Sequence, residues 1–351
     1  MLKALDMVAP GTALREGVDN IINASTGALI VIGDPAAMSH MFSGGLELDV
    51  DYSPALLYQV AKMDGAIVLD SEAQTIARAN VQLMPDPTIH SSETGTRHRT
   101  AERVAKQTKA LVIAVSARRE VVSLYSEGMK YVLQDIPTVL AKANQGLATL
   151  GKYRSRLDRV SRRLTTFELA GGGSLHDVLA VLQRAELLLR TSYEVERYII
   201  ELGTEGRLIE MQLEEMVVGV LSDRVALIRD YVTDDDEQTI DDTLAALAVV
   251  SHQELLDLGR LAELLGYDRK VNPHDLRVSA RGYRVLGRVP RLPRLVGEKV
   301  IAAFDGLEEI LNASESDLAE VEGVGDARAL DIREGFDRLR EVELFERYPQ
   351  I

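Results

Sequence analysis

The amino-acid sequence contains no cysteine, which excludes disulfide bonds, thiol nucleophiles and cysteine-ligated metal centres. Tryptophan is also absent, and aromatic residues make up only 5% of the chain, so stacking platforms for single-stranded nucleic acid are not expected. The six histidines never occur at the H-x-x-x-H spacing of a helical zinc site. These absences remove thiol and zinc chemistry from the functions to be considered.

Long apolar runs are missing as well, so no segment is expected to cross a bilayer, and residues 1–6 lack the charged-then-apolar layout of a signal peptide. Hydrophobic residues make up 46% and charged residues 27% of the 351 positions. This composition is ordinary for a folded chain of two or three domains. We therefore expect a cytoplasmic protein without a membrane partner.

The formal net charge is −15, which argues against a chain that binds nucleic acid along its whole length. Basic residues nevertheless gather between positions 269 and 299, where only Asp275 and Glu298 are acidic. The basic residues of this segment are Arg269, Lys270, Arg277, Arg281, Arg284, Arg288, Arg291, Arg294 and Lys299. The segment indicates a local anionic partner, and the alternative is a solvated linker.

The first 140 residues alternate short apolar strands with amphipathic helices. Helices are expected at residues 13–24, after Ser53-Pro54 and from about Ala101. Strands are expected at residues 28–32, 46–52, 66–69, 75–83 and 111–115, with a closing hairpin at 121–125 and 130–133. The pattern predicts an α/β domain with a mixed sheet flanked by helices.

From about residue 141 to residue 284 the apolar spacing becomes helical, with loops expected at the glycine-rich residues 171–174 and the acidic residues 234–237. We interpret this region as an all-helical spine in which no cluster of titratable groups stands apart from solvated helix faces. A third, compact helical module follows. The predicted domains are thus 1–140, 141–284 and 285–351.

One polar run, Gly-Thr-Arg-His-Arg-Thr at residues 95–100, directly precedes the helix expected from Ala101. A helix N-terminus presents unpaired backbone N–H groups and the positive end of the helix dipole. Glycine allows close approach, and arginines add bidentate donors. Because basic side chains there oppose the dipole unless an anion is bound, the run predicts a phosphate site. The alternative is a surface helix that merely begins with basic residues.

A second short run, Asp64-Gly65-Ala66, stands at the entry to an apolar strand. A carboxylate in this place suits a divalent metal that prefers oxygen ligands. Asp-Gly is also a common turn pair, so a purely structural turn is the alternative.

Taken together, Asp64-Gly65-Ala66 and Thr96-Arg97-His98-Arg99-Thr100 resemble the diadenylate cyclase domain. The wider stretch at residues 95–108 is similar to that family, and the resemblance continues through the spine and the C-terminal module. It points to the DNA integrity scanning branch of the family. The resemblance implies a nucleotidyltransferase that condenses two ATP into cyclic di-AMP and two pyrophosphates, with Mg²⁺ or Mn²⁺ as cofactor.

The resemblance also implies roles for individual residues. Asp64 would be the catalytic, metal-binding carboxylate, and Arg97, His98 and Arg99 would steady the pyrophosphate leaving group. The residues expected around the nucleotide are Gly65, Ala66, Leu83, Thr96, Arg97, His98, Arg99, Thr100, Ser116 and Arg118.

One pocket holds one ATP, so the reaction requires two pockets that face each other across a two-fold interface. The family implies an octamer with face-to-face catalytic domains, and a lone subunit is expected to bind ATP with almost no turnover. The alternative function is an ATP-sensing scaffold that binds DNA structures without converting the nucleotide. Asp64 distinguishes the two, because a sensor needs no catalytic metal ligand.

The C-terminal module carries Gly323-Val324-Gly325 between apolar positions Leu318, Val321 and Ala329. This pattern predicts a helix-hairpin-helix, in which the glycines allow a tight turn and the amides of the second helix face a DNA phosphate. A partner hairpin is expected at residues 289–295, where Arg291 and Pro293 replace the glycines. The alternative for both hairpins is a packing role.

Tandem hairpins of this kind bind DNA through its backbone without reading sequence, so affinity is expected to fall steeply with salt. The resemblance implies that the DNA is branched, that it regulates the cyclase in DNA-damage checkpoint signalling, and that the protein associates with the nucleoid. The residues expected at the DNA are Arg291, Arg294, Lys299, Gly323, Val324, Gly325 and Arg328.

Overall fold

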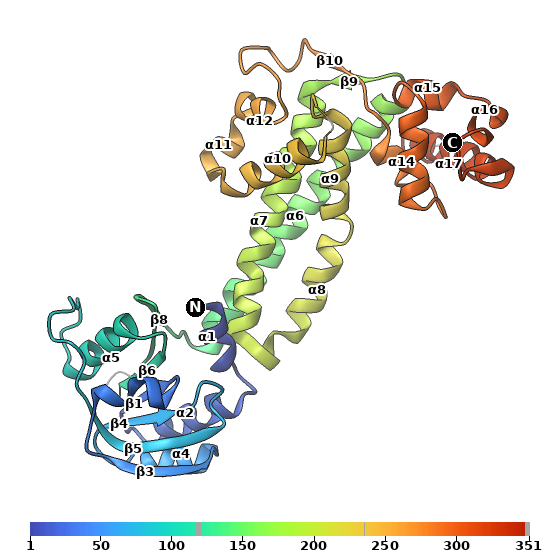
Figure 1. Ribbon diagram of the computed structural model, residues 1–351. Coiled ribbons are helices and arrows are strands. Elements are labelled where there is room, and N and C mark those ends of the chain that lie inside the picture. Colours follow the sequence, from blue (N-terminus) through green and yellow to red (C-terminus); the bar gives the residue numbers. More distant parts are fainter. Residues whose placement is uncertain (117–120, 235, 348–351) are drawn as a thin grey trace. The chain divides into compact units, whose positions relative to one another are not determined.

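The computed structural model describes residues 1–116, 121–234 and 236–347 (Figure 1). Within these residues, no helix combines the length and the apolar character needed to cross a membrane. The chain divides into two compact units, and the three predicted domains stay a prediction. One unit contains Met1–Gln145 together with Glu194–Gln212, and the other contains Gly146–Tyr193 together with the residues from Leu213 onward.

The first unit is built on an eight-stranded sheet, and its mixed character confirms the prediction, although the short strand at Phe42–Ser43 was not predicted. Its strand order is β2 (Phe42–Ser43), β5 (Thr75–Leu83), β4 (Ala66–Leu69), β1 (Ala28–Ile32), β6 (Leu111–Ser116), β7 (Val121–Ser126) and β8 (Met129–Val132), and β3 (Leu46–Asp51) also pairs with β5. The pair β1–β4 is parallel, whereas β1–β6, β4–β5, β6–β7 and β7–β8 are antiparallel.

Helices cover both faces of this sheet. On one face, Val18 and Ile21 of α2 (Ala13–Asn23) and Leu57 of α4 (Pro54–Val60) pack on Ile30 and Ile67 of the sheet. The opposite face of the sheet is covered by α5 (Thr96–Gln107), through its buried residues Ala101, Val104 and Ala105. The short helices α1 (Leu2–Met7), α3 (Pro35–Met38) and η1 (Ser39–Met41) complete the layers. The central strands β1 and β4 are therefore buried on both faces, which explains their continuous apolar runs.

One helix starts earlier than the sequence pattern predicted. The apolar spacing placed its beginning near Ala101, but α5 begins at Thr96 with Gly95 as the N-cap, and the first helical bond runs from Arg99 N to Gly95 O at 2.9 Å. The first turn is polar because it faces away from the core, so hydrophobic periodicity gives no signal there. The predicted phosphate run is consequently the first turn of the helix.

The helical region contains the long helices α6 (Ile136–Leu169) and α7 (Leu175–Leu202). The shorter elements that follow are η2 (Gly203–Gly206), α8 (Arg207–Val217), α9 (Val220–Tyr231), α10 (Glu237–Val249), α11 (His252–Leu256) and α12 (Leu258–Leu264). The prediction of helix and loop throughout is wrong at one place, because β9 (Gly173–Ser174) and β10 (Arg277–Val278) form a small antiparallel sheet. The two strands are far apart in sequence, so local pattern alone does not reveal the pairing.

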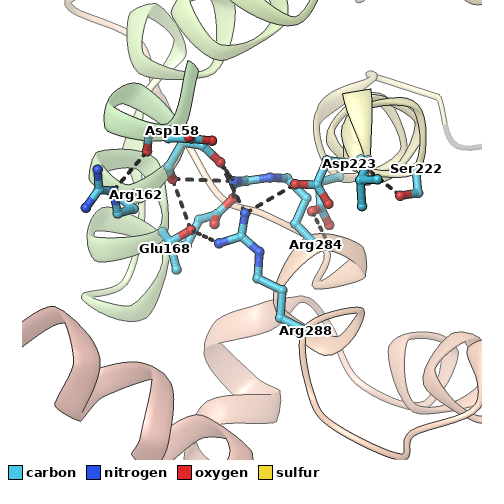
Figure 2. Close-up of polar contacts among 12 residues, drawn as sticks. Asp158, Arg162, Glu168, Ser222, Asp223, Arg284 and Arg288 are labelled. Carbon is cyan, nitrogen blue, oxygen red and sulfur yellow. Dashed lines mark hydrogen bonds and ion pairs between the residues drawn. The ribbon is translucent and has the colours of Figure 1, made fainter. Parts of the chain in front are cut away.

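The expectation that the spine holds no separable cluster of titratable groups is also wrong. Glu168 and Arg284 are 0% and 2% exposed and form an ion pair at 2.6 Å. The Tyr231 hydroxyl donates to the same Glu168 oxygen at 2.7 Å, and the neighbouring Asp230 is buried too. Figure 2 shows Glu168 and Arg284 side by side. Helix periodicity missed these residues because their partners lie on other elements.

The C-terminal part of the second unit is made of short helix pairs. Its helices are α13 (Tyr283–Leu286), α14 (Arg294–Ala303), α15 (Leu307–Asn312), α16 (Glu315–Ala319) and α17 (Gly325–Arg347). The turn between α16 and α17 has positive φ at Gly323 (89°) and Gly325 (59°), with the Val324 side chain buried between them. The turn between α13 and α14 reaches the same backbone region through Arg291, whose φ is 64°.

Candidate functional site

One edge of the mixed sheet gathers the residues that the sequence motifs singled out. Ala66 pairs with Leu29 and with Val81, and Ala28 pairs with Val115. Four strand ends therefore lie in one row: the start of β4, the start of β1, the end of β5 and the end of β6. One or two residues further out along each strand, past these paired residues, stand Asp64, Gly27, Leu83 and Ser116. Because neighbouring strands lie about 4.8 Å apart, Asp64 lies one strand away from Gly27.

Arg97 reaches this same edge from the first turn of α5. Its Nη1 donates to the carbonyl oxygen of Val115 at 3.2 Å. The guanidinium lies directly against Gly27, where a Cβ atom would collide with Nη1. Arg97 and Asp64 therefore belong to the same end of the strands, and that they share one nucleotide stays a prediction.

The N-terminus of α5 is open to an anion. Gly95 provides no side-chain cap, and the first turn contains no acidic residue. The backbone N–H groups of the first turn are therefore not capped by a side chain and can donate to a ligand. The helix dipole places positive potential at the same position. Thr96 and Thr100 stand in this turn with hydroxyl groups as further donors. The arrangement has the donor chemistry of a phosphate-binding helix end.

Arg99 is engaged differently from Arg97. Its Nε donates to Glu93 O at 3.3 Å and its Nη2 to Thr94 O at 3.2 Å. Arg99 thereby fastens the loop that leads into α5. A role of Arg99 at the phosphates stays a prediction.

His98 is held by a chain of hydrogen bonds that ends in a carboxylate. His98 Nδ1 lies 2.9 Å from the Tyr125 hydroxyl, which in turn donates to Glu93 Oε1 at 3.0 Å. Lys130 Nζ binds the same Glu93 oxygen at 2.6 Å. Since the Tyr125 proton goes to Glu93, His98 Nδ1 must be the donor to Tyr125.

The surroundings of Glu93 and Tyr125 set the charge states of these two members of the hydrogen-bonded chain. The hydrogen bond from Lys130 holds the pKa of Glu93 below its usual value, despite partial burial of the carboxyl group. Burial of Tyr125, reinforced by the nearby Glu93, raises the pKa of that hydroxyl well above its ordinary value. Glu93 is therefore ionised and Tyr125 protonated at neutral pH.

Asp64 is presented by a turn that only glycine fits. Gly65 has φ of 89°, and an added Cβ would lie 2.9 Å from backbone atoms of Asn80 and Val81 on β5. Asp64 itself is exposed, and it makes no hydrogen bond or ion pair to any residue that the structure describes. Its carboxylate is available to a cation at the edge of the sheet.

The remaining predicted residues fall into two groups. Ala66 and Leu83 are buried at the ends of β4 and β5, and Ser116 is half-buried at the end of β6. Arg118 lies outside the described residues.

Sequence reasoning missed three residues that build this site. Gly27 makes room for Arg97, and Glu93 and Tyr125 orient His98. Gly27 precedes an expected strand, so its sequence signal is that of an ordinary strand boundary. Tyr125 belonged to an expected hairpin, and nothing in its own strand indicates the contact with α5.

Several basic residues of the segment 269–299 are paired with acidic side chains, one of them in the protein interior. Arg284 pairs with the buried Glu168, Arg269 with Asp257 at 2.6 Å, and Lys299 with Glu322 at 2.7 Å. The partners Glu168, Asp257 and Glu322 all come from outside the segment. The surplus of positive charge counted along the sequence is therefore an overestimate of what an anion would meet.

Other basic residues of this segment serve the fold as well. Arg281 Nη1 donates to the carbonyl oxygens of Arg229 and Asp230, and Arg294 binds Glu298 at 3.0 Å. The Arg294 side chain is nevertheless 78% exposed, and Arg291 is exposed at the turn between α13 and α14.

The turn between α16 and α17 has the geometry that the hairpin prediction required. Arg328 Nη1 donates to Gly323 O and closes the turn. Leu318 and Ala329, both 0% exposed, pack the two helices together. The first turn of α17 carries one acidic residue, Asp326, which is unfavourable for an anion at this helix end.

Known proteins resemble this chain over nearly its whole length. Residues 15–130 match the family described as DisA bacterial checkpoint controller nucleotide-binding, and residues 133–273 match the DisA bacterial checkpoint controller linker region. The DNA integrity scanning protein DisA of Carboxydothermus hydrogenoformans is 50% identical over 338 residues, which cover 96% of each chain. That of Streptomyces coelicolor is 45% identical over 99% of this chain and 94% of its own. The chain therefore belongs to the DisA family of DNA integrity scanning proteins, with a nucleotide-binding domain of the diadenylate cyclase type.

Proposed function

We propose that this protein condenses two ATP molecules into cyclic di-AMP and two pyrophosphates. Two features at the same end of the strands support the proposal: the uncapped N-terminus of α5 with Arg97, and the exposed carboxylate of Asp64 ahead of β4. A triphosphate bound at the helix end would place its α-phosphate toward the carboxylate. Membership in a family with a nucleotide-binding domain supports the same ligand.

In the reaction, the 3′-hydroxyl oxygen of each nucleotide attacks the α-phosphorus of the other. A new P–O bond forms, the bond to pyrophosphate breaks, and the hydroxyl proton leaves to solvent. The protein's contribution is positioning and charge stabilisation. Arg97 and the amides of α5 bind the phosphates, and His98, held by Tyr125 in the same first turn, steadies the departing pyrophosphate.

The donor set fits a divalent cation that is shared with the substrate. No group of three or more His, Asp or Glu side chains suited to a metal occurs among the described residues. Mg²⁺ is commonly bound by one or two carboxylates plus substrate phosphates, and Asp64 is such a carboxylate. When bound, Mg²⁺ or Mn²⁺ would lower the pKa of the attacking hydroxyl and offset charge on the α-phosphate.

The stoichiometry requires two sites in one reaction space. Each subunit offers one uncapped helix end and one Asp64, so two subunits related by a two-fold axis supply both halves. An octamer with catalytic domains face to face meets this requirement.

Incubation of the full chain with ATP and Mn²⁺, followed by chromatography, tests the proposal. We expect cyclic di-AMP and two equivalents of pyrophosphate. ATP that is bound but returned unchanged under these conditions would instead identify a nucleotide sensor that scaffolds DNA.

Replacing Tyr125 with phenylalanine is expected to lower kcat about tenfold, with a smaller effect on KM. The change removes the acceptor of His98 Nδ1, and hydrogen bonds to charged groups contribute about 1.5–3 kcal/mol. The pH–rate profile should shift at the same time, since His98 loses the group that fixes its tautomer. Steady-state kinetics and histidine NMR measure both effects.

Tyr131→Phe is the matched control for this variant. The Tyr131 hydroxyl also binds a glutamate, Glu201, at 2.6 Å, but it has no contact with His98. An unchanged pH profile in Tyr125→Phe, or an equal shift in Tyr131→Phe, would remove the positioning role.

We further propose that the C-terminal helix pairs bind the DNA backbone. The exposed Arg291 and Arg294 and the tight turn at Gly323 and Gly325 support this placement. Contacts to phosphates alone give sequence-independent binding. Branched DNA is the expected ligand, and its binding is expected to regulate the cyclase.

The variant Arg291→Gln/Arg294→Gln is expected to weaken DNA binding uniformly across sequences and to lower the salt slope by about 2. Binding to a four-way junction, measured between 50 and about 200 mM salt, gives the slope. Arg338→Gln/Arg340→Gln, which removes two exposed charges from α17, is the control. Equal slopes in the double variant and the wild type would contradict the placement.

A further inference from the structure

A cavity of about 480 Å³ lies in the second unit among α6, α7, the start of α9 and α13. Five arginines line it: Arg154, Arg162, Arg224, Arg284 and Arg288. The described lining holds two carboxylates, Asp158 and Asp223. Figure 2 shows the side chains of Arg284 and Arg288 reaching between these two aspartates. The lining is therefore rich in N–H donors and poor in acceptors.

The donors of this cavity are only partly satisfied. Arg224 Nη1 binds Glu186 at 2.9 Å, but Arg224 Nε is buried with no hydrogen-bond partner among the described residues. Arg154 donates from Nε to Asp158 and from Nη1 to the carbonyl oxygens of Met216 and Val218. Its Nη2 has no acceptor among the described residues, on a side chain that is 34% exposed. A buried donor without an acceptor is costly, so Arg224 Nε favours a ligand that supplies one.

The arginines are held in place before any ligand arrives. Arg284 Nη1 binds Glu168 at 2.6 Å and its Nη2 binds Ser161 Oγ at 3.0 Å. Arg288 binds Thr165 Oγ1 at 2.8 Å and the same Ser161 hydroxyl at 3.1 Å. Fixed guanidinium groups lose little conformational entropy on binding, which favours affinity.

A helix end points at the same cavity. Gly219 and Val220 line it, and Gly219, with φ of 75°, caps α9 without a side-chain hydrogen bond. The first amides of this twelve-residue helix thus add to the guanidinium donors. The other walls of the cavity are apolar, with Leu157, Val181 and Leu227.

We propose that this cavity binds a small phosphorylated molecule of nucleotide size, at a site separate from the diadenylate cyclase domain. Arginine forks match phosphate geometry, the volume is that of a small-molecule site, and the apolar walls suit a ring or a base. A concave site with buried donors favours a free phosphate ester over the backbone of duplex DNA. The ligand would bridge α6, α9 and α13.

Hydrogen–deuterium exchange of the full chain with pyrophosphate as the probe tests the proposal. Pyrophosphate is expected to slow exchange at residues 219–224. In Arg154→Gln/Arg162→Gln the concentration needed for half of this protection should rise about tenfold or more. Arg154 is half-buried and Arg162 is exposed.

Arg156→Gln/Arg159→Gln is the control, since it removes the same charge from exposed positions of α6 that do not line the cavity. In this control variant, pyrophosphate should protect residues 219–224 from exchange as it does in the wild type. Protection near α5, by contrast, reports the cyclase site and should be the same in all variants. Absence of protection at residues 219–224, an equal loss in both variants, or protection by duplex DNA but not by pyrophosphate overturns the proposal.

Discussion

Replacing Asp64 with asparagine is expected to lower cyclic di-AMP formation by about a hundredfold or more while ATP still binds. The reason is that Asp64 supplies an exposed carboxylate at the strand ends that Arg97 also reaches, whereas the proposed phosphate donors belong to α5. Loss of one preorganised charged contact typically costs this much in rate. Chromatography of the product and ATP titration of the variant measure the two effects separately.

Asp70→Asn is the control for this experiment. Asp70 follows the opposite end of β4, where Oδ1 accepts from the backbone N–H groups of Gln74 and Thr75 at 2.7 and 3.2 Å. Asparagine retains that acceptor, so turnover should be unchanged. If Asp64→Asn cyclises ATP at the normal rate, the catalytic assignment is wrong.

Replacing Glu168 with glutamine is expected to lower the free energy of unfolding of the second unit by about 3–5 kcal/mol, because it leaves the Arg284 guanidinium buried without its counter-charge. Tyr231 loses the charged acceptor of its hydroxyl as well. Hydrogen exchange of the amides of α6 and α9 measures the stability of this unit directly.

Two further variants make the result interpretable. Glu334→Gln breaks an exposed pair with Arg338 on α17 and should change stability by less than about 1 kcal/mol. Glu168→Met/Arg284→Met removes both charges together and should be less destabilised than Glu168→Gln, because no buried charge is left alone. A double variant that is less stable than the single one would show that packing, not charge, dominates here.

The same network limits how the proposed binding of DNA by the C-terminal helices can be tested. A deletion that ends near Tyr283 also removes Arg284, and it therefore leaves Glu168 uncompensated. Asp230 is affected too, because its carboxylate accepts the backbone N–H groups of Gly282, Tyr283 and Arg284 at 2.6, 2.7 and 2.9 Å. Point substitutions on the exposed turns separate DNA binding from folding.

The fold of the first unit could be predicted where the signal was local. The strands at residues 28–32, 66–69 and 75–83 have the predicted bounds, because apolar runs between turn residues are read directly from the sequence. Ser53 caps α4 by accepting from Leu56 N, as the Ser-Pro pair indicated. The start of α5 was missed because its first turn has no apolar periodicity.

The sequence by itself determined the composition of the candidate site, since Asp64, Arg97 and His98 stand in recognisable runs. Only the tertiary structure decided which residues contact them. Gly27 lies against the Arg97 guanidinium, and Tyr125, hydrogen-bonded to Glu93, holds His98. It also decided that Arg284 is a buried partner of Glu168 rather than an exposed basic residue. The physical reason is the same in each case. A motif is a property of neighbours along the chain, whereas burial and charge pairing depend on residues that only the folded chain brings together.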